Sequence, residues 1–156
     1  MAADVPLATL IALRRLLLGI LLFGFAGTAA ELLLIGHHED AWQLLPLVMI
    51  GIAAVVAVGL AVADSTSPRG SAWTRPLQTV MVLLILTGML GMVLHYRANM
   101  EFKLEMDPSL SGFALFSSVV RATAPPALAP GNMALLGLLG LACTFRLDGS
   151  SLSRNL

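Results

Sequence analysis

Residues 77–96 read LQTVMVLLILTGMLGMVLHY, and they contain no Asp, Glu, Lys or Arg. A helix of about 20 residues crosses the ~30 Å hydrocarbon core of a bilayer, so this stretch predicts a transmembrane helix. Three more apolar stretches of similar length lie at 16–35, 41–63 and 127–145. Backbone groups in lipid must be bonded within their own segment, and four segments are too few for a barrel. The sequence therefore predicts an all-α membrane protein, a four-helix antiparallel bundle that forms one domain over residues 1–156.

The composition of the whole chain agrees with a membrane protein. Of its 156 residues, 58% are hydrophobic and only 12% are charged, and the mean hydropathy is +0.89. This is more apolar surface than one soluble domain of this length can bury. The formal net charge of zero argues against a nucleic-acid partner. The expected partners are the lipid bilayer and, within it, other membrane subunits or a second copy of the chain. The single cysteine, Cys143, excludes an internal disulfide and a CxxC redox pair.

The basic residues set the expected orientation of the four crossings. One side of the membrane holds six of them: Arg14, Arg15, Arg69, Arg75, Arg146 and Arg154. The other side holds three: Arg97, Lys103 and Arg121. The positive-inside rule then predicts a multi-pass protein of a bacterial-type inner membrane with both termini in the cytoplasm. Arg14 and Arg15 would also suit a cleaved signal peptide, but the apolar run that follows them continues to Ile35, which favours a spanning helix.

The outer face carries the longest predicted connection, residues 97–126. Its first part contains no helix breaker until Pro108, so we expect the third helix to continue beyond the membrane as a helical extension. The apolar segment 112–120 is too short to span. It predicts a short amphipathic segment that lies on the membrane surface or packs over the mouth of the bundle. A long loop in so small a protein is the natural place for a function.

All three histidines and most carboxylates fall on this outer side. Imidazole nitrogens and carboxylate oxygens are ligands for divalent zinc, manganese or iron. The candidate metal ligands are His37, His38, Glu39, Asp40, His95, Glu101 and Glu105. No HExxH motif or other fixed ligand spacing accompanies them, and a solvated turn accounts equally well for the HHED sequence. Copper, with methionine thioethers as further ligands, and haem, with His95 as an axial ligand, are weaker alternatives.

One polar pair is predicted inside the bundle. Glu31 falls within the first predicted span and Asn132 lies early in the fourth, where an interhelical hydrogen bond would join them as a structural pair.

The functional hypotheses follow from the outer face. The first is an accessory, scaffold or ligand-binding subunit that acts through this periplasmic side, and the second is a metal-binding membrane protein. The third is a membrane enzyme that uses the outer carboxylates. Because the sequence contains no catalytic motif, we favour a protein that is not an enzyme.

Overall fold

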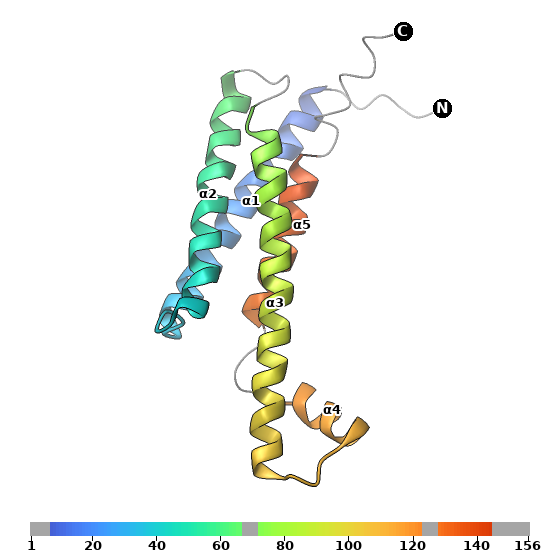
Figure 1. Cartoon of the computed structure of the whole chain (residues 1–156). Coiled ribbons are helices and arrows are strands. Elements are labelled where there is room, and N and C mark those ends of the chain that lie inside the picture. Colours follow the sequence, from blue (N-terminus) through green and yellow to red (C-terminus); the bar gives the residue numbers. More distant parts are fainter. Residues whose placement is uncertain (1–6, 67–71, 123–127, 145–156) are drawn as a thin grey trace, which may run out of the picture.

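The described part of the chain is entirely helical. The structure is a computed structural model that describes residues 7–66, 72–122 and 128–144 (Figure 1). Its five helices are α1 (Leu7–Leu34), α2 (Ala41–Thr66), α3 (Thr74–Met106), α4 (Gly112–Val120) and α5 (Leu128–Cys143). These residues include no strand. The predicted all-α class is therefore confirmed.

Three of these helices are long and apolar enough to cross a membrane, namely α1, α2 and α3. Helix α5 is apolar but has 16 residues, which gives a rise of about 24 Å and falls short of the ~30 Å core. A fourth crossing over 127–145 therefore stays a prediction, and its two end residues lie outside the described part. Residues 123–126 of the expected outer loop also lie outside the described part. So do three of the basic residues used for the orientation, Arg69, Arg146 and Arg154.

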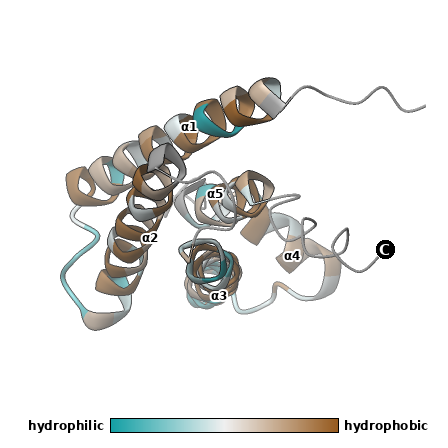
Figure 2. Cartoon of the chain, turned by 90° about the horizontal axis from the view of Figure 1, so that it is seen from above, coloured by the Kyte–Doolittle hydropathy of each residue, from teal (hydrophilic) through white to brown (hydrophobic). Residues whose placement is uncertain are grey.

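Four helices contact one another in a closed ring. Helix α3 packs against α2 on one side and most extensively against α5 on the other, and α1 contacts both α2 and α5. Consecutive members of the ring run in opposite directions, and α4 stands apart from them, beside α3 (Figure 1). The buried interior is made of apolar side chains from all four helices, including Leu21, Phe25, Leu60, Met81 and Met133. Most of each ring helix is hydrophobic in Figure 2, and apolar side chains such as Phe23, Val55 and Leu86 are exposed, as expected for helices that face lipid.

The contact between α3 and α5 depends on glycine in both helices. A Cβ atom added at Gly88 of α3 would lie 2.6 Å from the backbone oxygen of Pro130. A Cβ atom added at Gly137 of α5 would lie 2.8 Å from the backbone oxygen of Met81. Since lipid supplies no hydrophobic force between helices, such close backbone packing is a main source of their association. The two glycines therefore allow the backbones of α3 and α5 to approach closely at two levels of their contact.

Helix α3 continues to Met106, well beyond the apolar run that ends at Tyr96. It stops at Asp107, whose carboxylate accepts hydrogen bonds from the hydroxyl of Ser109 at 2.6 Å and from its backbone N–H at 3.0 Å. These two bonds stabilise the ionised form and lower the pKa of Asp107. After this turn, α4 lies beside α3 on the side away from α2 (Figures 1 and 2).

Candidate functional site

The connection between α1 and α2 is held by backbone and side-chain hydrogen bonds at both of its ends. Gly36 adopts a left-handed backbone with φ of +69°, which glycine tolerates at no steric cost. The N–H of His37 donates to the carbonyl of Leu32 at 2.9 Å, and the N–H of Gly36 donates to Leu33 at 3.2 Å. This pair of bonds is the Schellman motif that closes many helices. It fixes the direction in which the chain leaves α1 and so places His37.

Asp40 closes the other end of the same connection by capping α2. Its carboxylate accepts a hydrogen bond from the N–H of Gln43 at 2.8 Å. The side-chain oxygen of Gln43 in turn accepts from the N–H of Glu39 at 2.9 Å. The arrangement satisfies backbone donors that a helix start otherwise leaves unpaired. One carboxylate oxygen of Asp40 is therefore already engaged in holding the fold.

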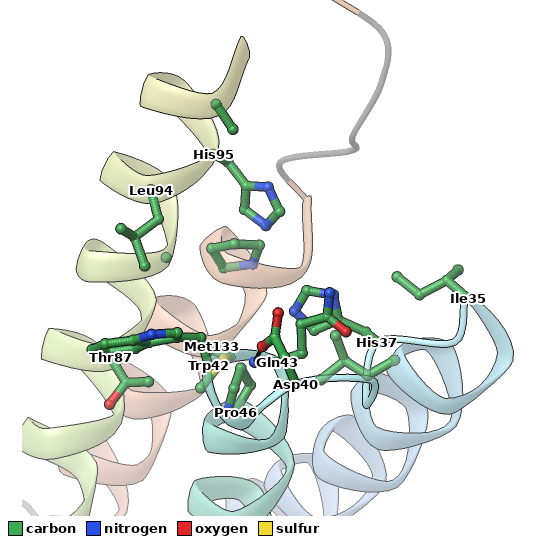
Figure 3. A pocket seen from close by; sticks show the side chains of 14 residues that line it. Ile35, His37, Asp40, Trp42, Gln43, Pro46, Thr87, Leu94, His95 and Met133 are labelled. Carbon is green, nitrogen blue, oxygen red and sulfur yellow. Dashed lines mark hydrogen bonds between the residues drawn. The ribbon is translucent and has the colours of Figure 1, made fainter. Parts of the chain in front are cut away.

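A pocket of about 340 Å³ lies where this connection faces α3 and the start of α5. Figure 3 shows that its side chains come from four places in the chain, the α1 end, the α2 start, α3 and α5. Most of the wall is apolar. The lining residues are Leu32, Ile35, His37, Asp40, Trp42, Gln43, Pro46, Thr87, Gly91, Leu94, His95, Ala98, Pro130 and Met133.

Two imidazoles meet in this pocket from opposite walls. The ring centroids of His37 and His95 are 6.1 Å apart, and the ring planes make an angle of 29°. His37 comes from the turn after α1 and His95 from the middle of α3, so residues 58 positions apart in the sequence become neighbours. Both side chains are half-buried. The pair gives the mostly apolar pocket its main hydrogen-bonding groups.

The predicted metal ligands divide into two sets. His37, Asp40 and His95 line the pocket. The other four do not, and all of them are exposed: His38, Glu39, Glu101 and Glu105. Glu101 and Glu105 lie on the extension of α3 beyond the pocket, so the distance along that helix separates them from the histidine pair. Within residues 7–66, 72–122 and 128–144, no three His, Cys, Asp or Glu side chains group closely enough to hold a metal ion.

The polar residues expected inside the bundle lie in different surroundings. Glu31 is half-buried on α1, whereas Asn132 is exposed on α5, and the described contacts contain no hydrogen bond between them. Asn99 is instead the buried polar side chain of this region, with an exposed fraction of 7%. It follows His95 by one helical turn on α3, whereas Met106 further along is 73% exposed.

Sequence reasoning missed most of the pocket wall. Gln43 carried a usable signal, because an Asp followed three residues later by Gln is a capping pattern that ties both side chains to a helix start. Thr87 and Gly91 gave no such signal, since they lie inside an apolar run. They line the pocket because of the way α3 is oriented about its own axis, which the sequence does not state. Pro130 and Met133 come from α5, whose distance from α3 the sequence does not state.

A function for this chain has to be inferred from the geometry of the pocket. No known protein family, curated protein or solved structure matches this chain.

Proposed function

We propose that this chain is a ligand-binding subunit of a bacterial-type inner membrane. In this proposal it holds a small, largely apolar molecule at its outer, periplasmic face. The observation that carries the proposal is the pocket of about 340 Å³ behind the α1–α2 connection. Its volume falls within the roughly 300–1,000 Å³ of typical ligand sites, and it combines apolar walls with a few converging polar groups, as such sites do.

The polar groups of the pocket define the ligand that would suit it. One oxygen of Asp40 and the side-chain oxygen of Gln43 are engaged in the helix cap. The hydroxyl of Thr87 donates to the carbonyl of Leu83 at 2.8 Å. The imidazoles of His37 and His95, the amide nitrogen of Gln43 and the indole N–H of Trp42 therefore supply donors to the pocket. A ligand with acceptor oxygens at one end and an apolar body would satisfy these donors and the apolar wall together.

The orientation is part of the same proposal. With α5 as a fourth crossing, the positive-inside count of six basic residues against three puts both termini in the cytoplasm and the pocket outside. Cysteine labelling tests this in a Cys143→Ala background. We expect His38→Cys to react with a membrane-impermeant maleimide in intact cells, and Ala72→Cys, between α2 and α3, to react only after permeabilisation. Labelling of both residues from one side would contradict the orientation.

Ligand binding is tested by comparing pocket variants with matched controls. The protein is purified in detergent, and the bound small molecules are extracted and quantified by mass spectrometry. His37→Ala and His95→Ala remove donors from the pocket, whereas His38→Ala removes an exposed imidazole beside it. Ala98→Leu adds volume at the pocket wall, and Ala114→Leu makes the same change on the exposed surface of α4.

The expected result is a molecule that co-purifies with the wild type and both controls and is depleted in the three pocket variants. Loss of one good hydrogen bond costs about 1 kcal/mol, or roughly fivefold in affinity. A co-purifying molecule that is equally abundant in pocket and control variants, or absent throughout, would argue against the proposal. The pocket occupies one end of the ring of helices. The sides of the ring would therefore be left for contact with other membrane proteins or a second copy, as an accessory subunit requires.

A further inference from the structure

Helix α4 presents an apolar face that is at least half exposed in the described structure. Phe113, Phe116 and Val120 are spaced three and four residues apart, so they lie on one side of the helix. Their exposed fractions are 82%, 50% and 61%. Val119, which is buried, and Leu115, which is half-buried, lie about 110° further round α4, on the side that packs on α3. A nine-residue helix with this division is too short to span a membrane but suits its surface.

The position of this face is fixed by Tyr96. The Tyr96 and Phe116 ring centroids are 6.3 Å apart, and Phe116 and Phe113 are separated by the same distance. Tyr96 ends the apolar run of α3, the level at which aromatic rings favour the boundary between lipid and water. Met89, Met92 and Val93 precede it on the same side of α3 and are exposed. The apolar face of α4 therefore continues the lipid-facing side of α3.

Two basic side chains lie beside the apolar face of α4. Lys103 follows Tyr96 by two helical turns and so lies on the side of α3 that carries α4. Arg121 caps the C-terminal end of α4. Glu101 and Glu105 are exposed and lie about 160° around α3 from Lys103. Lys103 and Arg121 thus flank the aromatic face and Glu101 and Glu105 point away from it, while the Asp107 carboxylate in the turn before α4 is bonded to Ser109. The two basic groups are complementary to lipid phosphate.

We propose that α4 lies in the interface of the outer lipid leaflet as a phospholipid-binding surface. Phe113, Phe116 and Val120 enter the boundary between headgroups and acyl chains, and Lys103 and Arg121 contact lipid phosphates. This surface is separate from the pocket, because none of these five residues lines it. Its occupant is phospholipid, and a second protein chain on the same face is the outcome that the test must distinguish.

Tryptophan fluorescence in vesicles tests the proposal on the full chain. Trp42 and Trp73 are changed to Phe, and one tryptophan is then introduced at a time. Phe113→Trp places the probe on the apolar face, and Glu105→Trp is the matched control on the exposed side of α3. The protein is reconstituted in phosphatidylcholine vesicles, with or without bromine on the acyl chains. Acrylamide is the second quencher, because it is water-soluble and uncharged and the charges beside each probe do not change its local concentration.

We expect brominated lipid to quench Phe113→Trp and acrylamide to quench it about threefold less than Glu105→Trp, since an interfacial ring lies about 5–10 Å deep. Replacing Lys103 and Arg121 by Glu should raise acrylamide quenching of the same probe. Acrylamide quenching equal to that of Glu105→Trp would place α4 in water and overturn the proposal. A probe shielded from both quenchers would identify a protein contact and overturn it as well.

Discussion

Replacing Gly88 by alanine should push α5 away from α3 and destabilise the protein. The new Cβ would lie 2.6 Å from the backbone oxygen of Pro130, which is 0.8 Å inside the 3.4 Å where ordinary contact begins. That oxygen belongs to a helix backbone and cannot rotate away, so α5 itself must move. Overpacking of this kind costs about 1–3 kcal/mol. Alanine returns up to about 1 kcal/mol of helix propensity, so we expect a net loss of about 0–2 kcal/mol, and a stability about 1–3 kcal/mol below that of a glycine-to-alanine change made where there is space.

The free energy of unfolding can be measured by titrating the purified protein with SDS in mixed micelles. Gly27→Ala and Gly51→Ala are matched controls, because a Cβ at either position meets no atom within 4 Å. These controls should be as stable as the wild type or slightly more so. Since Pro130 also lines the pocket, Gly88→Ala should retain less of the co-purified molecule. If Gly88→Ala matched its controls in stability, the close approach of α3 and α5 would be refuted.

Three further predictions concern the turns. Asp40→Ala should cost about 1 kcal/mol in the same titration because α2 loses its cap, whereas Asp40→Asn should keep most of the stability; equal losses would show that the cap is not the cause. Gly36→Ala should cost about 1 kcal/mol, because φ of +69° strains a residue with a Cβ, and should reduce ligand retention by displacing His37. The lowered pKa of Asp107 means that its contribution to the turn is complete above the ordinary value of 3.8 and is lost as pH falls through the lower, folded value. The Ser109 amide resonance should therefore titrate with a midpoint below 3.8, and Asp107→Asn should abolish that titration.

The sequence predicted the long elements well because their signal is local. Residues 77–96 gave α3 its apolar run, and the absence of a breaker before Pro108 anticipated its continuation to Met106. The fourth apolar stretch predicted more than the structure describes as helix, since α5 ends at Cys143 and begins at Leu128. Element existence follows from composition over about 20 residues, whereas the ends depend on local turns.

The site was less predictable because it depends on rotation and distance between helices. The structure brings His37 and His95 together in one pocket, yet His38, the immediate neighbour of His37, is exposed and lies outside it. The left-handed turn at Gly36 separates the two, and composition does not reveal its conformation. Asp40 looked like a metal ligand, but one of its oxygens caps a helix. Residue type indicated the chemistry, and backbone hydrogen bonds decided which side chains share a cavity.

His95 and Tyr96 are successive residues of one unbroken helix. One faces the pocket and the other contacts Phe116 of α4, so a rigid backbone joins the cavity to the aromatic face. A bilayer that changes thickness tilts the helices embedded in it. Any tilt or roll of α3 that α4 follows would also swing the His95 imidazole relative to His37, so mechanical strain in the membrane would be transmitted to the place where the two rings meet.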